Sequence, residues 1–201
     1  MIFMANKLDA EKSALREQIR TRLKTIPAAE RAAASAQLRT RLAQEKFFAD
    51  AKTILFFAPL PGEPDIWPLI PLALGLCKLV ALPRFSPKTQ AYVACRVLNP
   101  QTDIEIGKFG IREPSARCAE VPLNQLDFIL VPGVAFDLKG RRLGRGQGYY
   151  DRLLAQVRGV TCGVAFEQQI VGEVPAGPHD VGLNCILTPT RWVEPKQRAV
   201  L

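Results

Sequence analysis

The chain has 201 residues, of which 48% are hydrophobic and 23% are charged. This length fits one domain that can bury a core without disulfides or a metal, and the composition excludes a disordered, collagen-like or coiled-coil protein. The 27 lysines and arginines outnumber the 19 acidic residues, so the net charge is +8. Such an excess favours an anionic partner: a nucleic acid, an anionic membrane, or a phosphorylated or polycarboxylate small molecule.

The N-terminal quarter is predicted to be helical. Apolar residues recur at helical spacing between Leu8 and Leu23, and again between Ala34 and Leu42. Pro27 separates the two predicted helices, and proline suits the first turn of the second one.

From Thr53 onward, short apolar strands alternate with helices. The predicted strands are, in chain order, 53–58, 78–82, 92–98, 128–131, 160–166 and 185–187. Helices are predicted over 66–76 and 148–158, and Pro83 is expected to end the second strand. Residues 101–121 are predicted to be a loop, because glycine and proline interrupt any periodic pattern there.

Strands that are apolar throughout are typical of a sheet buried on both faces, which indicates the α/β class. We expect a single domain over residues 1–201, with an open, mostly parallel sheet and helices on both faces in a Rossmann-like three-layer arrangement. Ligands in such folds bind beyond the carboxyl ends of the strands. The segments that follow predicted strand ends are 59–65, 83–85 and 132–150.

Neither a membrane span nor a disulfide framework is predicted. No run of about 18 apolar residues occurs, and the apolar start of the chain is too short for a signal peptide. The five cysteines form no C-x-x-C pair and have no neighbouring histidine, which is typical of free thiols in a reducing cytosol. We therefore expect a cytoplasmic protein.

The strongest candidate for a functional loop lies in the last of these segments. Gly144, Gly146 and Gly148 alternate there, with Arg142 and Arg145 among them. Glycines let backbone N–H groups curl around an anion, arginines supply forked donors for phosphate, and the helix predicted to follow would add its positive end. This pattern predicts a phosphate-binding loop, although it matches neither a Walker A loop nor a dinucleotide fingerprint.

The loop's residues alone leave two other interpretations open. A flexible, solvated basic loop has the same composition, and a nucleic-acid groove could use Tyr149 and Tyr150 to stack bases. Residues 138–158 carry six basic residues and a single acid, Asp151. A carboxylate beside a phosphate loop favours a metal-bound nucleotide, because it would repel a bare nucleic-acid backbone.

A longer sequence pattern favours the nucleotide-binding interpretation over a solvated loop or a nucleic-acid groove. Residues 136–151, F-D-L-K-G-R-R-L-G-R-G-Q-G-Y-Y-D, resemble the signature of the 5-formyltetrahydrofolate cyclo-ligase (5,10-methenyltetrahydrofolate synthetase) family. The resemblance covers about residues 12–188. Further elements that agree, in chain order, are Lys12-x-x-Leu15-Arg16, Glu63-x-Asp65, Pro83-Arg84-Phe85, Val164-Ala165-Phe166 followed by Gln168 or Gln169, and His179-Asp180.

The resemblance implies an enzyme that uses ATP and Mg²⁺ to cyclise 5-formyltetrahydrofolate to 5,10-methenyltetrahydrofolate, with release of ADP and phosphate. ATP would phosphorylate the formyl oxygen, and the substrate's own amine would then attack the activated carbon. The expected partner is thus a small molecule, the folate with or without a polyglutamate tail, and we expect no nucleic acid, no membrane and a monomer. A different ATP-using enzyme on the same scaffold stays an alternative.

The resemblance also implies roles for individual residues. ATP would be bound by Lys12, Arg16, Arg142, Gly144, Arg145, Gly146, Gln147, Gly148 and Tyr149. The substrate would contact Glu63, Arg84, Phe85 and Tyr150. The catalytic residues would be Arg145, Tyr150 and Glu63. Mg²⁺ would be held by Asp151 and Asp180, and a slot for the pterin ring would be lined by Leu60, Ile66 and Trp67.

Three residues depart from the family pattern. Gln147 stands where relatives commonly carry Lys or Gly, Asn184 stands where many have a second acid, and Ile66 follows Asp65 where Thr is usual. A neutral amide can donate to phosphate but adds no charge, so we expect weaker nucleotide binding.

Overall fold

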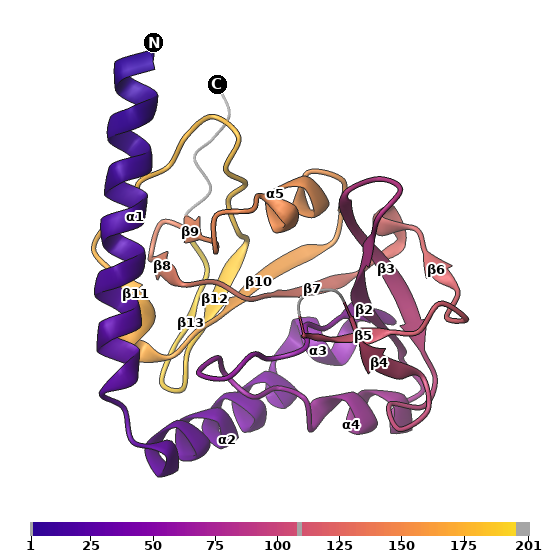
Figure 1. Cartoon of the computed structure of the whole chain (residues 1–201). Coiled ribbons are helices and arrows are strands. Elements are labelled where there is room, and N and C mark those ends of the chain that lie inside the picture. Colours follow the sequence, from indigo (N-terminus) through magenta and orange to yellow (C-terminus); the bar gives the residue numbers. More distant parts are fainter. Residues whose placement is uncertain (1, 108–109, 196–201) are drawn as a thin grey trace.

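An eight-stranded sheet runs through the middle of the molecule (Figure 1). The computed structural model describes the backbone of residues 2–107 and 110–195, with side chains from Lys7 onward. The strand order is β13-β12-β10-β7-β1-β2-β3-β6. These strands are β1 (Thr53–Leu55), β2 (Leu79–Ser86), β3 (Ala91–Val97), β6 (Glu120–Val121), β7 (Phe128–Val131), β10 (Val160–Val164), β12 (Cys185–Leu187) and β13 (Trp192–Val193).

The five strands from β12 to β2 are parallel to one another, whereas β13, β3 and β6 pair antiparallel. Numbered in chain order, the parallel strands lie in the sequence 2-1-3-4-5, which is the flavodoxin-like order. The predicted mostly parallel α/β sheet is therefore confirmed, but the Rossmann-like part is not, since that order is 3-2-1-4-5-6. The winding reverses between β1 and β7, and a crevice opens where the loops that follow these two strands diverge.

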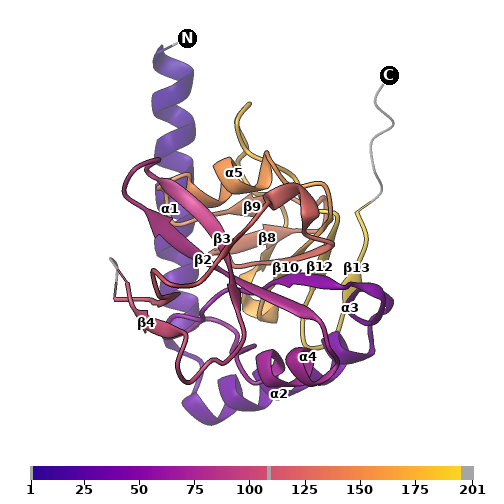
Figure 2. The same ribbon diagram turned by 90° about the vertical axis from the view of Figure 1, so that its right-hand side faces the viewer.

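Helices cover both faces of the sheet, as predicted (Figures 1 and 2). On one face, α2 (Ala28–Gln44), α3 (Lys46–Asp50) and α4 (Leu69–Gly75) pack on a core with Phe56 and Phe128. On the other face, α5 (Tyr149–Leu154) packs through Leu153 and Leu154 against Ile129. The apolar strands are thus buried from both sides.

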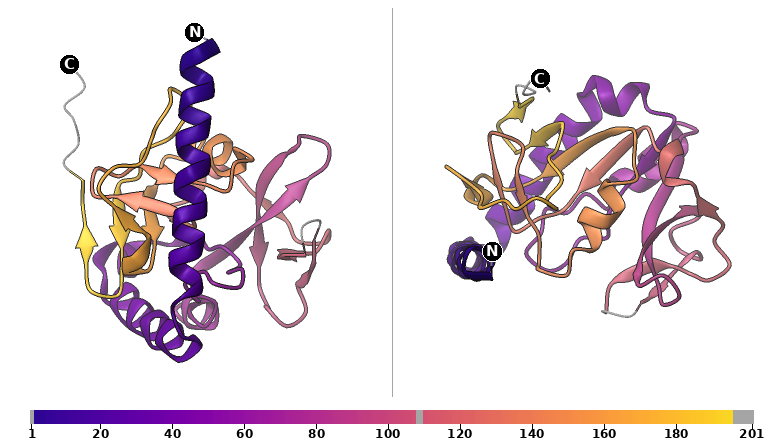
Figure 3. Two further views of the ribbon diagram at one scale, coloured as in Figure 1. Left: turned by 60° about the vertical axis from the view of Figure 1, so that its left-hand side comes forward. Right: turned by 90° about the horizontal axis from the view of Figure 1, so that it is seen from above.

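The longest helix, α1 (Ile2–Lys24), stands at one side of the sheet (Figure 3). It packs there on a small three-stranded sheet of β11 (Ile170–Val171), β8 (Ala135–Asp137) and β9 (Arg142–Leu143), and on the short helix η2 (Glu167–Gln169). Ile19 is fully buried in this contact, together with Val134 and Leu143. This packing holds α1 beside the glycine-rich loop.

Strand β2 does not end at Pro83, as the sequence predicted, because its pairing with β3 continues and places Pro83 opposite Ala94. The N–H of Leu79 and the C=O of Ala81 both face β1. The nitrogen of Pro83 therefore faces the same side, beyond the last residue of β1. Its missing N–H costs no ladder hydrogen bond at that position.

The segment 101–121, predicted to be a loop, contains three short strands. β4 (Ile104–Ile106) and β5 (Arg112–Pro114) form an antiparallel pair, and β6 adds to the edge of the main sheet. Between β6 and β7 lies the short helix η1 (Leu123–Gln125). Strands of two or three residues are too short for a periodic pattern to show in the sequence.

None of the helices in the described ranges combines the length and the apolar character that a bilayer crossing requires.

Candidate active site

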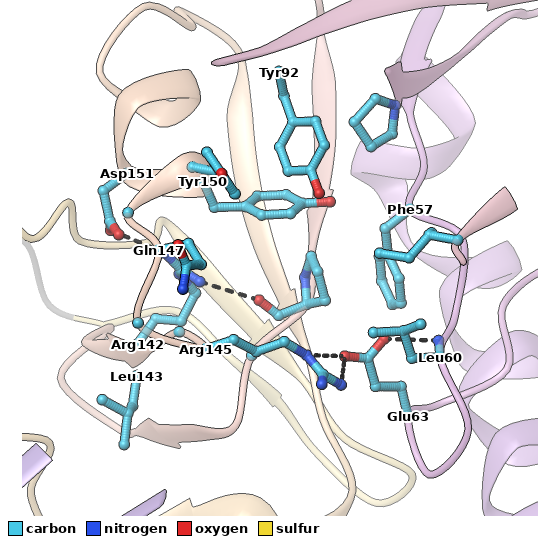
Figure 4. Close-up of a pocket in the computed structure, with 18 of the residues that line it drawn as sticks. Phe57, Leu60, Glu63, Tyr92, Arg142, Leu143, Arg145, Gln147, Tyr150 and Asp151 are labelled. Atoms are coloured by element: carbon cyan, nitrogen blue, oxygen red, sulfur yellow. Dashed lines mark hydrogen bonds and ion pairs between the residues drawn. The ribbon is translucent and has the colours of Figure 1, made fainter. Parts of the chain in front are cut away.

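A cavity of about 470 Å³ opens where the winding of the sheet reverses, between the loops that follow β1 and β7 (Figure 4). Its walls come from these two loops, from the glycine-rich loop, from the first turn of α5 and from one face of α1. The predicted site residues that line it are Lys12, Arg16, Glu63, Arg142, Gly144, Arg145, Gly146, Gln147, Gly148, Tyr149, Tyr150, Asp151 and Asp180.

The glycine-rich loop takes its shape from backbone positions that favour glycine. Gly146 has a φ of +104° and Gly148 a φ of +64°, a region that residues with a side chain rarely adopt. A Cβ on Gly144 would lie 2.9 Å from Nη1 of Arg142. The helix that follows, α5, has only six residues, so the positive helix end expected from the sequence contributes little here.

Arg142 forms the buried floor of the loop, and 3% of its side chain is exposed. Its Nη2 donates to Oδ1 of Asp151 at 2.9 Å and its Nη1 to the carbonyl of Pro132 at 3.3 Å (Figure 4). Its Nε is buried and finds no acceptor within the described part of the chain. The guanidinium also lies 5.7 Å from the centre of the Tyr150 ring. Arg142 is thus held in place from several sides.

Arg145 and Glu63 join the glycine-rich loop to the loop after β1. Nη2 of Arg145 lies 2.8 Å from Oε1 of Glu63, and the other oxygen of Glu63 accepts the N–H of Leu60 at 3.0 Å (Figure 4). The Arg145 side chain is 53% exposed, whereas that of Glu63 is 10% exposed. Glu63 is therefore the fixed partner of this pair, and Arg145 is free to turn toward a ligand.

Helix α1 reaches the cavity through two basic residues. Nζ of Lys12 lies 2.5 Å from Oδ2 of Asp180, which also accepts the N–H of Gly177 at 2.6 Å. Burial would raise the pKa of Asp180, but these two hydrogen bonds outweigh it and lower the pKa below its ordinary value. Nε of Arg16 donates to the carbonyl of Gly144 at 2.9 Å. The helix thus supplies cations to the side of the cavity that the glycine-rich loop forms.

A magnesium site made by the protein alone is not found: the described residues hold no group of three or more Asp, Glu, His or Cys side chains that could bind a metal. Asp151 and Asp180 both line the cavity, and each already accepts a hydrogen bond from a cation. Mg²⁺ usually keeps several waters and takes one or two carboxylates together with substrate phosphates. The two aspartates fit a metal that arrives with a nucleotide.

Two predicted substrate contacts, Arg84 and Phe85, do not line the cavity. Arg84 donates to two carbonyls of the connection between β5 and β6, at 2.9 and 3.3 Å, and lies 3.2 Å from Glu120. Phe85 is 5% exposed and packs edge-on against Tyr149 and Tyr92. Arg84 therefore supports an edge strand, and Phe85 supports the aromatic wall from behind, so neither is proposed here as a substrate contact.

The expected pterin slot is also revised by the structure. Leu60 does line the cavity. Ile66 is fully buried in the core, in one cluster with residues of α2 and α4. Trp67 lines a neighbouring hollow instead.

Tyr92 and Glu113 are cavity residues that the sequence did not reveal. Burial raises the pKa of Tyr92 to about 12 and the pKa of Tyr150 well above its ordinary value, so both phenols stay protonated. Burial also raises the pKa of Glu113, whose Oε2 accepts the N–H of Phe85 at 3.1 Å. Tyr92 was a plain strand residue in the sequence, and Glu113 lay in the supposed loop, so no local pattern marked either of them.

The sequence profile of the 5-formyltetrahydrofolate cyclo-ligase family matches residues 8–189. The chain belongs to this family. The 5-formyltetrahydrofolate cyclo-ligase of Haemophilus influenzae is 35% identical over 180 residues, which cover 86% of this chain and 96% of that protein. The Escherichia coli K12 protein of the same name is 30% identical over 177 residues, which cover 86% of this chain and 97% of that protein.

Solved structures agree with this assignment. The NMR structure of Aquifex aeolicus 5,10-methenyltetrahydrofolate synthetase matches with a TM-score of 0.84 and 34% identity, over 94% of this chain and 95% of that one. The Mycoplasma pneumoniae 5,10-methenyltetrahydrofolate synthetase, at 24% identity and a TM-score of 0.71, shares the fold. The resemblance noted in the sequence is confirmed, and the chain is an enzyme of this ligase family.

Proposed function

We propose that this enzyme cyclises 5-formyltetrahydrofolate to 5,10-methenyltetrahydrofolate in an ATP- and Mg²⁺-dependent reaction that releases ADP and phosphate. Family membership supports the folate chemistry. The observation that carries the proposal is the Arg145–Glu63 pair, which joins a phosphate-type loop to a fixed carboxylate inside one cavity. A cavity built in this way can hold a nucleotide and a second reactant side by side.

The chemistry requires two bond exchanges. The formyl oxygen attacks the terminal phosphoryl group of ATP, and ADP is the leaving group. The free amine of the folate then attacks the formyl carbon, its proton is removed, and the C–O bond breaks to release phosphate. The enzyme chiefly has to align these groups and neutralise the phosphate charge, as in phosphoryl transfer generally.

Glu63 is the residue placed to receive the amine. Its side chain is 10% exposed and held by the N–H of Leu60. When Arg145 turns from Glu63 toward a phosphate, Oε1 of Glu63 becomes free to accept a hydrogen bond from the attacking amine and then its proton. In this proposal Arg145 stabilises the phosphoryl group, and Tyr150 borders the substrate beside it.

The remaining cavity cations would hold the nucleotide. Lys12, Arg16 and Arg142 face the same space as the glycine-rich loop, and arginine forks match phosphate oxygens. Gln147 would donate from its amide without adding charge. Mg²⁺ would neutralise phosphate charge next to Asp151 and Asp180.

A direct assay tests this function. The methenyl product absorbs at the ultraviolet edge of the visible range, so 5-formyltetrahydrofolate with Mg-ATP should develop this band, and omission of ATP or chelation of Mg²⁺ should abolish it. Arg145→Ala and Asp151→Asn should each reduce turnover by at least about tenfold, since Arg145 would stabilise the transferred phosphoryl group and Asp151 would help to hold Mg²⁺ beside it. The matched control is Arg96→Ala, which removes an exposed arginine on β3 outside the cavity. A well-folded wild-type protein without an ATP-dependent band would refute the proposal.

A further inference from the structure

A second hollow, of about 410 Å³, adjoins the active-site cavity. Leu60, Glu63 and Arg112 line both spaces, so a ligand can extend from one into the other. The residues that line the second hollow are Pro59, Leu60, Pro61, Gly62, Glu63, Asp65, Trp67, Pro68 and Arg112.

Arg112 stands at this junction with its donors free. Its guanidinium carbon lies 3.7 Å from the centre of the Trp67 ring, a stacked contact that orients the group and leaves its N–H edge open. Within the described ranges, the Arg112 side chain has no hydrogen bond or ion pair. By contrast, Arg16, Arg142 and Arg145 each donate to an oxygen.

The two carboxylates that line the second hollow already have cationic partners. Glu63 pairs with Arg145 at 2.8 Å, and Asp65 lies 3.8 Å from Nη1 of Arg39. The charge of Arg112 is therefore left uncompensated in the hollow, which favours an anionic ligand group there.

We propose that the second hollow binds the glutamate end of the folate, with Arg112 pairing with a carboxylate of that tail. This inference rests on the proposed function. The attacking amine carries the benzoyl ring, and the ring carries the glutamate through an amide. With the amine at Glu63, the ring leaves the reacting centre beside Leu60 and Pro61, and the glutamate reaches the guanidinium of Arg112. A stacked guanidinium can hold a carboxylate with two parallel hydrogen bonds.

Arg112 is thus a specificity-determining residue rather than a catalytic one. The tail is remote from the atoms that react, so its contact with Arg112 stays the same in the ground state and in the transition state. An interaction of this kind affects KM and leaves kcat unchanged.

The test compares two substrates and three variants. The substrates are 5-formyltetrahydrofolate and 5-formyltetrahydropteroate, which lacks the glutamate. Arg112→Gln should raise KM about tenfold for the substrate with glutamate, the loss expected for one charge-assisted pair, and should change neither kcat nor the KM of the shorter substrate. Arg112→Lys should retain part of the affinity. Arg96→Gln removes the same charge from an exposed position on β3 and should behave as wild type.

Binding without ATP supplies a second readout, because Trp67 lies under Arg112 and its fluorescence should respond to the occupied hollow. An equal rise in KM for both substrates, or no rise at all, would overturn the assignment of Arg112. A wild-type enzyme that forms no methenyl product would instead overturn the proposed function. The two failures are therefore distinguishable in the same experiment.

Discussion

Opposite charges in the cavity are arranged in pairs that differ mainly in burial. Arg142 and Asp151 form a pair in which the arginine side chain is 3% exposed, whereas Arg145 in the pair with Glu63 is 53% exposed. Removing one member of a buried pair leaves an unmatched charge in a low-dielectric site, but an exposed cation is simply solvated by water. Arg142 thus contributes to stability as well as to the site, whereas Arg145 is a ligand-facing residue that contributes little to stability.

Stability measurements should separate these two roles. Asp151→Ala should lower the free energy of unfolding by about 3 kcal/mol, because Arg142 stays buried without its carboxylate. Glu63→Gln should change it by less than about 1 kcal/mol, because the cation that is left behind, Arg145, is exposed to water. Urea denaturation of both variants measures the difference, and equal losses would contradict the distinction.

The lowered pKa of Glu167 should make the free energy of unfolding depend on pH. Burial would raise its pKa, but hydrogen bonds from Arg191, Thr188 and Thr190 outweigh it and lower the pKa to about 2, from an ordinary 4.5. A lowered pKa in the folded state contributes stability above pH 4.5, and this contribution is lost as the pH falls toward 2.

Glu167→Gln should therefore flatten the acid limb of the stability curve by on the order of 1 kcal/mol, since the site is partly exposed. Urea titrations at several pH values between 5 and 2 would measure this effect. Parallel curves for the variant and the wild type would show that Glu167 makes no such contribution.

At the scale of elements, several boundaries are set by contacts rather than by local sequence. The helix predicted over 148–158 ends at Leu154 as α5. Gly159 was expected to end that helix. Instead it allows the chain to pass close to the backbone before β10, where a Cβ would lie 2.1 Å from the carbonyl of Leu126 and 2.5 Å from that of Asp127.

Gly159→Ala should therefore destabilise the protein by about 2 kcal/mol or more, because two backbone carbonyls would have to move. Gly172→Ala is the matched control, since a Cβ there meets nothing within 4 Å, and it should be neutral or slightly stabilising. Thermal unfolding of the two variants measures the contrast. A Gly159 variant as stable as the Gly172 variant would rule out the close approach.

At the scale of the whole molecule, the cavity is formed by segments far apart in the chain. α1, the loop after β1, the loop after β7 and the start of α5 all contribute residues to its lining. A ligand that contacts all of them ties the N-terminal helix to the sheet. Ligand binding should consequently stabilise the fold as a unit.

A non-hydrolysable ATP analogue with Mg²⁺ should raise the midpoint of thermal unfolding. At 100 times its Kd, the gain is about 2.7 kcal/mol, which corresponds to roughly 5–10 °C for a chain of this size. Chelation of Mg²⁺ should reduce the shift, and Asp151→Asn should make the shift less dependent on the metal. An unchanged midpoint at saturating nucleotide would contradict the nucleotide site.

The sequence by itself determined the class of the fold, the glycine-rich loop and the family, because each can be recognised from a contiguous run of residues. Buried strands show as apolar runs, and the loop at residues 136–151 is contiguous. Of the eighteen residues predicted for the site, fourteen line the cavity. The exceptions are Arg84 and Phe85, on a strand that was predicted to end at Pro83, Ile66, which lies in the core, and Trp67, which lines the neighbouring hollow.

Only the tertiary structure decided the strand order, the partners of each charge and the presence of Tyr92, Glu113 and Arg112 in the cavity. These depend on contacts between residues far apart in the chain, such as Arg145 with Glu63 or Lys12 with Asp180. No local pattern encodes such a contact, since burial and the distance between charges arise only when the sheet closes around the cavity. In the cavity, Lys12, Arg142 and Arg145 each pair with an acid, whereas Arg112, at the edge of the site, has no ion pair among the described residues.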